Sequence, residues 1–265
     1  MTMKEYGVAL VTGAGSGIGQ ETAIHLAEKG ARVIVTDISE AGISDTVRKI
    51  EALGGVALGQ RLDVSDPDDI EAAFAAAERW DKCVDILVNN AGIVNIQTFL
   101  EFTAKSWHQV MDVNLTGSFL CAQRAARDMI GQSYGRIINM SSVSGLRAGV
   151  GRTAYGTSKA AIIGLTRQIA LEMGPYGITA NAIAPGPIMT PLIEATYSEE
   201  TIARLLPMIP VGRFGSCSDI AEAVCYLASP KTGYVNGEIL TVDGGYASAG
   251  MTQTGTLDLA KGKNK

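Results

Sequence analysis

Residues 8–30, VALVTGAGSGIGQETAIHLAEKG, contain the features that decide the fold. A short apolar run over 8–11 predicts a buried strand, and the residues after 19 have the spacing of a helix that ends at Gly30. Four glycines stand at alternate positions from 13 to 19, between this strand and this helix. Such a turn lets the backbone approach a phosphate group closely at a helix N-terminus. The stretch therefore predicts the opening strand, turn and helix of a nucleotide-binding unit.

The glycine turn does not follow the common G-x-G-x-x-G pattern, because Ile18 and Gln20 occupy the positions where its last glycine would fall. It instead has the pattern T-G-x-x-x-G-x-G, formed by Thr12, Gly13, Gly17 and Gly19. Glycine also serves tight strand-to-helix turns for steric reasons alone. In the order strand, turn, helix, phosphate binding is the preferred interpretation.

Apolar runs and helical patterns alternate along the rest of the chain. Further strands are expected at 33–36, 56–63, 84–92, 135–142, 178–186 and 237–245, and helices at about 39–53, 66–80, 103–130, 154–173 and 218–229, with a loop and helix region at 191–206. This alternation predicts an α/β fold, a Rossmann-type doubly wound parallel sheet of about seven strands with helices on both faces. No Pro-, Gly- or Ser-rich linker interrupts it, so residues 1–246 are expected to form a single dinucleotide-binding and catalytic domain, followed by a polar C-terminal tail at 247–265.

The composition of the 265 residues favours a folded enzyme that binds a small molecule. Hydrophobic residues make up 46% and charged residues 18%, which supports a sizeable core and argues against disorder. The net charge of −5 gives no general attraction to nucleic acid or to anionic membranes. No apolar stretch approaches the length of a membrane span, and the first apolar run is too short for a signal-peptide core. The four cysteines show no C-x-x-C spacing and are expected to be reduced, so a cytoplasmic location is expected.

Tyr155 and Lys159 stand one turn apart in the helix expected at 154–173. Side chains at i and i+4 leave the same helical face and can converge on one point. A positive charge some 4 to 5 Å from a phenol contributes roughly 3 to 4 kcal/mol at an effective dielectric constant of about 20. Lys159 is therefore expected to lower the pKa of Tyr155 from its usual ~10 toward neutrality, where a general acid/base works best. Taken alone, the two residues are also compatible with an ordinary surface pair.

Asp37 ends the second expected strand, eighteen residues after Gly19. A carboxylate at this position can accept hydrogen bonds from a ribose diol. It would also repel a 2′-phosphate, and neither Ser16 nor Ile38 offers a compensating cation. This favours NAD over NADP as the cofactor; a helix-capping or solvated aspartate is the alternative.

Two other polar clusters have a local explanation. Asn114, Thr116 and Gly117 are poor helix formers in the middle of the helix expected at 103–130, so a kink or an open carbonyl is expected there. The acidic residues at 66, 68 and 69 suit a helix N-terminus through its dipole. No metal site is predicted.

Taken together, these motifs resemble the short-chain dehydrogenase/reductase family. They are spread in the family's order over nearly the whole chain: TGAGSGIG (12–19), Asp63-Val64, NNAG (89–92), Asn114, Ser142, the Tyr155/Lys159 pair, PGPIMT (185–190) and VDGG (242–245). The resemblance implies an NAD-dependent oxidoreductase that interconverts a secondary alcohol and a ketone. It assigns Tyr155 as the general acid/base and Lys159 as its pKa-lowering neighbour and a ligand of the nicotinamide ribose.

The resemblance also implies roles for two further catalytic residues. Ser142 would hydrogen-bond the substrate oxygen, and Asn114 would link Lys159 to solvent through water. Ser141 is a rival to Ser142 by proximity only, because adjacent side chains of a strand point to opposite faces and one of the two should reach the site.

A cofactor-binding set follows from the same resemblance. Its members are Gly13, Ser16, Gly17, Ile18, Gly19, Asp37, Ile38, Asp63, Val64, Asn90, Ala91, Gly92, Tyr155, Lys159, Pro185, Gly186, Ile188 and Thr190. Asp63 and Val64 would lie beside the adenine, residues 90–92 along the adenosine ribose, and Ile188 and Thr190 at the nicotinamide carboxamide. The family also implies a homotetramer, with helices 103–130 and 153–174 at one interface and the last strand at another. The polar tail is predicted to reach across a neighbouring subunit.

The substrate is left open by these motifs. The segments expected to build its pocket offer a largely apolar lining of Ile93, Val94, Leu146, Met189, Leu192, Ile193 and Tyr197. Arg147 and Arg152 stand between Ser142 and Tyr155; either one binds a carboxylate or phosphate of the substrate, or both have solvent or interface roles. Two alternative functions are a 3-oxoacyl thioester reductase of the fatty-acid type, whose usual NADPH preference disagrees with Asp37, and a non-catalytic nucleotide-binding scaffold on the same fold.

Overall fold

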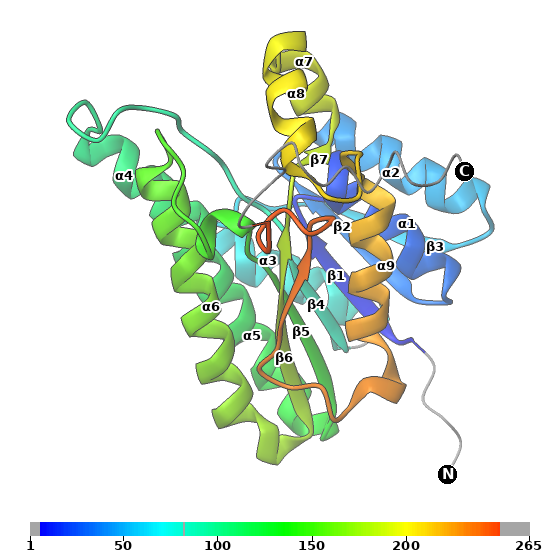
Figure 1. Ribbon diagram of the computed structural model, residues 1–265. Coiled ribbons are helices and arrows are strands. Elements are labelled where there is room, and N and C mark those ends of the chain that lie inside the picture. Colours follow the sequence, from blue (N-terminus) through cyan, green and yellow to red (C-terminus); the bar gives the residue numbers. More distant parts are fainter. Residues whose placement is uncertain (1–5, 82, 250–265) are drawn as a thin grey trace.

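A seven-stranded sheet forms the centre of the computed structural model, which describes residues 6–81 and 83–249. All its neighbouring strands are parallel, in the order β3-β2-β1-β4-β5-β6-β9 (Figure 1). The strands are β1 (Val8–Thr12), β2 (Arg32–Asp37), β3 (Val56–Arg61), β4 (Ile86–Asn89), β5 (Gly135–Met140), β6 (Ile178–Pro185) and β9 (Ile239–Val242). The predicted doubly wound parallel sheet is confirmed.

Helices cover both faces of this sheet (Figure 1). One face is covered by α1 (Gly17–Glu28), α2 (Glu40–Ala52) and α9 (Cys217–Ala228), and the other by α3 (Pro67–Trp80), α5 (Gly117–Gln132) and α6 (Thr153–Met173). The short helices α7 (Pro191–Thr196) and α8 (Glu199–Leu205) project beyond the carboxyl ends of the strands (Figure 1).

Strand β1 shows why the strands are continuous apolar runs. Val8 and Leu10 pack into the core beneath α3 and α5, whereas Ala9 and Val11 pack into the core beneath α1 and α9. A sheet buried on both faces needs apolar side chains on both sides of each strand. Each large aliphatic side chain buried in this way contributes roughly 1.5 to 3 kcal/mol.

The helix starts follow from polar capping residues. Asp66 caps α3 and accepts a hydrogen bond from the backbone N–H of Asp68 at 2.9 Å, with proline at the first helical position as predicted. Helix α9 begins one residue before the predicted position, because Ser216 and Asp219 form a reciprocal capping box there.

The helix predicted at 103–130 is interrupted where its poor helix formers stand. It consists of α4 (Ala104–Met111), a π-helical segment η1 (Asp112–Thr116) and α5. Ser118 Oγ donates to the backbone carbonyl of Asn114 at 2.9 Å. A π-helical segment changes the direction of a helix and opens its backbone hydrogen bonding, so the expected local disruption is confirmed.

Several boundaries differ from the prediction. Strand β3 ends at Arg61, before the predicted end at 63, because the chain there leaves the sheet. Strand β4 ends at Asn89, within the 84–92 segment that was predicted to run from a strand into a loop. A second parallel sheet was not predicted; it pairs β7 (Ile188–Met189) with β8 (Gly215–Ser216). Within the described part of the chain, no helix has the length and apolarity needed to cross a membrane. The predicted tail lies outside the described residues from 250 onward.

The strand order reverses between β1 and β4, which are direct neighbours in the sheet. The chain winds from β1 toward β3 on one side and from β4 toward β9 on the other. The loops after β1 and β4 therefore diverge and leave a crevice at the carboxyl ends of the strands, where ligands of such sheets bind. The glycine turn and the NNAG segment meet at this point.

Candidate functional site

The glycine turn is packed too tightly for side chains at two of its positions. A Cβ atom added to Gly19 would overlap the carbonyl oxygen of Gly13, and one added to Gly13 would lie 2.9 Å from the Cα of Ala91. Gly13 and Gly17 also have positive φ angles of 64° and 55°, which L-residues with side chains rarely adopt. The turn thus needs glycine for close approach and for backbone conformation.

Asn90 and Thr12 hold this turn against the end of β4. The side-chain amide of Asn90 donates to the carbonyl oxygens of Thr12 at 2.9 Å and Gly13 at 3.0 Å. The backbone N–H groups of Asn90 and Ala91 each donate to Thr12 Oγ1 at 3.0 Å. The Asn90 side chain therefore positions the turn rather than facing a ribose, and Thr12 joins the site although the predicted set omitted it.

We expect Gly19→Ala to destabilise the protein by about 1 to 3 kcal/mol and to weaken dinucleotide binding, because the added methyl group forces the backbone of the turn apart. Gly131→Ala is the matched control, since a Cβ at this helical position meets no atom within 4 Å. It should stabilise the protein by up to about 1 kcal/mol. Thermal unfolding and NADH titration check both variants; equal unfolding temperatures for the two would contradict the packing argument.

Asp37 lies at the end of β2 beside the turn. Its Oδ2 accepts a hydrogen bond from the backbone N–H of Gly15 at 2.9 Å, and its Oδ1 accepts one from Ser39 at 2.9 Å. Asp37 therefore holds the glycine turn and the residue that caps α2, Ser39, but does not itself cap a helix. A carboxylate has about four acceptor positions, so these two bonds leave capacity for ribose hydroxyls. Arg61, the residue in register with Asp37 on β3, is hydrogen-bonded to Asp69 instead.

The entrance to helix α1 has features of an anion site. Ser16 is exposed at its N-cap position and makes no side-chain capping bond, and the first turn contains no acidic residue. The first N–H groups of the helix are thus directed at the crevice, together with the positive end of the helix dipole. Ile18 packs partly into the core, whereas Ile38 is 66% exposed at the rim.

Asp63 follows β3 and is an ionised acceptor. Its Oδ1 accepts hydrogen bonds from the backbone N–H of Ser65 at 2.9 Å and from the Ser65 hydroxyl at 2.6 Å. These two bonds lower the pKa of the Asp63 carboxyl. Val64 beside it is buried and packs against the glycine that begins α5, Gly117. The pair forms one wall at the carboxyl end of the sheet.

Lys159 is buried, with 4% of its surface exposed. Its Nζ donates to the carbonyl oxygen of Met140, the last residue of β5, at 2.7 Å. Burial lowers the pKa of the amine to about 8. A Cβ on Gly92 would lie 3.4 Å from Nζ, so glycine at this position keeps the lysine accessible from the loop after β4.

Tyr155 and Ser142 meet beside this lysine. The ring centroid of Tyr155 lies 5.7 Å from Lys159 Nζ, and the Ser142 side chain acts on the Tyr155 hydroxyl and lowers its pKa. Burial raises the pKa of Tyr155, against smaller lowering effects of the Ser142 hydrogen bond and the Arg152 charge. The prediction that Lys159 lowers the pKa of Tyr155 is therefore wrong for the protein without its cofactor. Desolvation of the phenol outweighs charge attraction, and Lys159 Nζ is directed at the Met140 carbonyl.

The two serines after β5 point in opposite directions. Ser141 Oγ donates to the backbone carbonyl of Lys159 at 2.8 Å, inside the core. Ser142 Oγ accepts the backbone N–H of Ser144 at 3.0 Å and faces Tyr155. Strand alternation thus separates a structural serine from the one at the site, as predicted.

Asn114 clamps the loop after β4 to helix α6. Its Oδ1 accepts the backbone N–H of Ile93 at 2.8 Å, and its Nδ2 donates to the Ile93 carbonyl at 3.0 Å and to Ser158 Oγ at 3.1 Å. The side chain is fully buried. The implied link from Lys159 to solvent through water stays a prediction. Ser158, which sequence reasoning missed, completes the clamp.

The loop after β6 returns over the glycine turn. Gly186 donates to the carbonyl of Val242 at 3.0 Å, which ties the end of β6 to β9. Thr190 caps α7, accepting the N–H of Ile193 at 3.2 Å, and its methyl group lies 3.9 Å from a Cβ built on Gly17. The members of the predicted cofactor set from this loop, Pro185, Gly186, Ile188 and Thr190, therefore lie at the carboxyl end of β6 and above the turn.

The predicted lining of the substrate pocket is spread over three loops. Val94 and Leu146 are 41% and 44% exposed, and Ile93 is held in place by Asn114. Tyr197, after α7, is half-buried. Of these positions, Tyr197 is connected to Tyr155 through Arg152, which contacts both residues. The side chain of Leu192 is not among those described.

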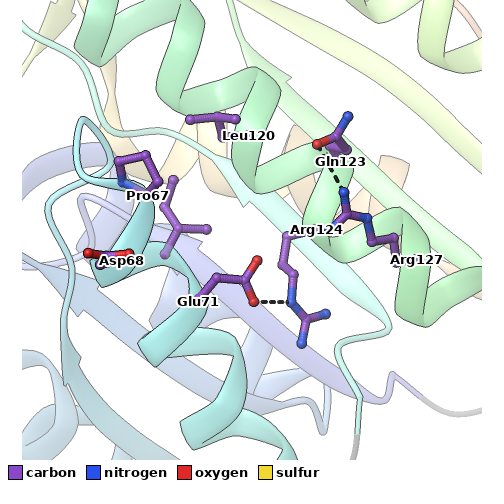
Figure 2. Close-up of a pocket in the computed structure, with 8 residues that line it drawn as sticks. Pro67, Asp68, Glu71, Leu120, Gln123, Arg124 and Arg127 are labelled. Atoms are coloured by element: carbon purple, nitrogen blue, oxygen red, sulfur yellow. Dashed lines mark hydrogen bonds and ion pairs between the residues drawn. The ribbon is translucent and has the colours of Figure 1, made fainter.

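Figure 2 shows a different hollow, between α3 and α5, that contains none of these residues. Among the residues that line it, Arg124 is a partly buried cation that pairs with Glu71 at 2.9 Å, Glu78 at 2.5 Å and Asp128 at 2.5 Å. These three carboxylates already pair with the guanidinium, so Arg124 holds α3 and α5 together and is not free to bind a ligand in this hollow.

The sequence also matches known proteins. Residues 13–247 match a family model described as enoyl-(acyl carrier protein) reductase. A short-chain reductase protein NovJ from Streptomyces niveus is 41% identical over 251 residues, covering 92% of this chain and 95% of that protein. A 3-oxoacyl-[acyl-carrier-protein] reductase FabG from Aquifex aeolicus is 41% identical over 239 residues, covering 90% and 96%.

Solved structures share the fold over nearly its whole length. The crystal structure of levodione reductase has a TM-score of 0.89 and 33% identity, covering 93% of this chain and 99% of that one. A structure from Agrobacterium tumefaciens with NADP bound has a TM-score of 0.85 and 37% identity, covering 91% and 96%.

Proposed function

The chain belongs to the short-chain dehydrogenase/reductase family, and from this premise we propose that it is an NAD-dependent oxidoreductase that interconverts a secondary alcohol and a ketone. Members of the family are oxidoreductases that bind a nicotinamide cofactor. The observation that carries the proposal is the convergence of Ser142, Tyr155 and Lys159 beside the glycine turn.

In this proposal Tyr155 takes the hydroxyl proton of the alcohol, and in reduction it returns that proton to the ketone oxygen. Ser142 holds the reacting oxygen through its hydrogen bond. A bound nicotinamide ring would supply the hydride chemistry, exchanging a hydride with the substrate carbon that carries the reacting oxygen. Lys159 binds the nicotinamide ribose and stabilises the phenolate that the proton transfer requires. The proton and the hydride together account for the two hydrogens that an alcohol loses.

The crevice fits a dinucleotide. Gly13, Gly17 and Gly19 leave backbone where side chains would fill the space, and the N-terminus of α1 offers N–H groups to a pyrophosphate. Asp37 has acceptor capacity for the adenosine ribose, and Asp63 is an ionised acceptor for the adenine. These residues are the ones we propose to hold the cofactor.

The preference for NAD rests on Asp37, since the neighbouring cation in register with it on β3, Arg61, is already paired with Asp69. We expect the wild type to favour NAD over NADP by about 100-fold in kcat/KM, because a carboxylate opposite a 2′-phosphate is strongly unfavourable. Asp37→Asn should reduce this ratio by about 10-fold or more. Glu51→Gln, an equal change of charge at the exposed far end of α2, is the control and should leave the ratio unchanged. A wild type that prefers NADP would refute the assignment.

A second candidate is a 3-oxoacyl thioester reductase, which the FabG relative at 41% identity favours. It would use the same serine, tyrosine and lysine. An NADH-fluorescence screen over polyols, hydroxy acids, steroids and hydroxyacyl thioesters, repeated with NADPH, separates the two candidates. The first proposal expects turnover of a free alcohol or ketone with NAD(H). Turnover confined to thioesters with NADPH would replace it, and binding without any turnover would leave only a nucleotide-binding scaffold.

A further inference from the structure

The two arginines between Ser142 and Tyr155 have different surroundings. Arg147 donates to the carbonyl oxygen of Tyr246 at 2.9 Å, and its guanidinium lies 5.8 Å from the Tyr246 ring. It is therefore committed to the segment after β9. Arg152 instead lies beside Tyr155, with its guanidinium carbon 5.6 Å from the ring centroid.

Arg152 has unused hydrogen-bonding capacity. Among the described arginines that are not exposed, Arg32 and Arg124 pair with carboxylates and Arg136 donates to three backbone carbonyls. Arg152 donates to a single neutral group, the hydroxyl of Tyr197, at 3.3 Å. Within the described chain no carboxylate lies at ion-pair distance from it. A guanidinium has five N–H donors, so most of this group is free to bind a ligand.

The position of Arg152 directs this capacity at the substrate region. It is the N-cap residue of α6, whose first turn contains no acidic residue, so the helix dipole adds to its positive charge. Its bond to Tyr197 joins the start of α6 to the segment after α7, a helix that projects beyond the carboxyl ends of the strands (Figure 1). The charge also acts on the reacting group, since it lowers the pKa of Tyr155.

We propose that Arg152, with the Tyr197 hydroxyl beside it, binds a carboxylate of the substrate, so that the enzyme acts on small hydroxy acids and oxo acids. This inference rests on the proposed function. A planar guanidinium matches a carboxylate through two parallel hydrogen bonds. One arginine balances one negative charge, which favours a carboxylate over a phosphate dianion. The carboxylate lies a few covalent bonds from the reacting carbon, because the guanidinium adjoins the Tyr155 ring.

Matched substrates and variants test this assignment. The probes are 2-, 3- and 4-hydroxy acids, their neutral methyl esters and the corresponding hydroxyalkyl phosphates, assayed with NAD. We expect the wild type to prefer an acid over its ester by at least about 10-fold in kcat/KM. Arg152→Lys keeps the charge but loses the planar fork, and should raise KM for the acid about 10-fold while kcat and the ester rate stay within about twofold. Tyr197→Phe should raise KM for the acid by a smaller factor.

Further variants separate substrate binding from indirect effects. Arg152→Ala should raise KM for the acid by about 10- to 100-fold, compared at the pH optimum of each protein because the Arg152 charge also affects Tyr155. Arg167→Ala, an exposed arginine on the same helix, is the control and should leave the preference for the acid unchanged. Equal use of acid and ester by the wild type, or equal losses for both in Arg152→Lys, would overturn the proposal. Preference for the phosphate would overturn the carboxylate assignment.

Failure of the proposed function has a different signature. In that case no alcohol or ketone is turned over with either cofactor. Calorimetric titration of the protein with oxo acids, with and without NADH, then still decides the role of Arg152. Tighter binding of the acid by the wild type than by Arg152→Ala supports the site, whereas equal or undetectable binding in both refutes it.

Discussion

Tyr155→Phe is expected to lower kcat/KM for alcohol oxidation by about 10³-fold, with unchanged stability and cofactor affinity. The substitution removes the phenol oxygen, and a positioned general acid/base contributes about 10²- to 10⁴-fold. Neither neighbour replaces it: Ser142 Oγ is bonded to the N–H of Ser144, and Lys159 Nζ is bonded to the carbonyl of Met140. Single-turnover kinetics, NADH titration and thermal unfolding measure the three quantities.

The direction of the Tyr155 pKa shift predicts the pH dependence. Because burial raises this pKa, most of the phenol is protonated at neutral pH. Oxidation needs the phenolate and should accelerate as pH rises through the joint titration of Tyr155 and Lys159, whereas ketone reduction needs the phenol and should fall on the alkaline side. Tyr155→Phe should abolish both trends, and Tyr234→Phe, at a fully exposed position, should preserve them. A Phe variant that keeps most of the turnover would exclude this mechanism.

Lys159→Met is expected to reduce activity about 10²-fold and yet to stabilise the fold at neutral pH. Burial lowers the pKa of Lys159 from its ordinary 10.5 to about 8, which corresponds to a cost of about 3 kcal/mol for holding the charged amine. Methionine removes this cost but leaves the Met140 carbonyl without its donor, a loss of about 1 to 3 kcal/mol. The free energy of unfolding at pH 7 should therefore rise by roughly 1 kcal/mol.

The sign of the pH dependence follows from proton binding. Between pH 8 and 10.5 the unfolded chain binds the Lys159 proton and the folded chain does not, so wild-type stability rises with pH in this window. Below pH 8 both states are protonated and the full cost of burial applies. The advantage of Lys159→Met should accordingly shrink and reverse by about pH 10. Lys105→Met, at an exposed position on α4, should show no such trend in chemical denaturation. A pH-independent difference between wild type and Lys159→Met would contradict the role of burial.

Much of the fold could be predicted because its signals are local. The buried strands are short apolar runs. The N-terminus of α3 was predicted from Asp66 and the proline that follows it, and the disruption around Asn114 was predicted from the weak helix formers there. The short strands β7 and β8 escaped prediction because each has two residues and forms only when distant segments pair. A pairing of this kind leaves no periodic pattern in either segment.

The features of the site also fall into those with a local signal in the sequence and those that depend on contacts between distant segments. The spacing of Tyr155 and Lys159 is a property of one helix, and the opposite directions of Ser141 and Ser142 are a property of the extended chain just after β5. The hydrogen bonds of Asn90 and Asn114 could not be predicted, because the sequence does not show which backbone groups an amide side chain will bond. Both were selected for cofactor or solvent contacts, and the structure adds that both side chains hold loops of the site together.

The sequence by itself determined the parallel α/β architecture and the glycine turn, which depend on periodicity and steric demands, and the one-turn spacing of Tyr155 and Lys159 within a helix. Ser142 joined this predicted set only through the family resemblance. Only the tertiary structure decided the direction of the Tyr155 pKa shift, the partners of Asp37 and the separation of Arg147 from Arg152. Each of these depends on desolvation or on a contact between segments far apart in the chain, such as the bond from Arg152 to Tyr197. Burial and long-range contact arise only when the elements pack, and for that reason local sequence patterns could not predict them.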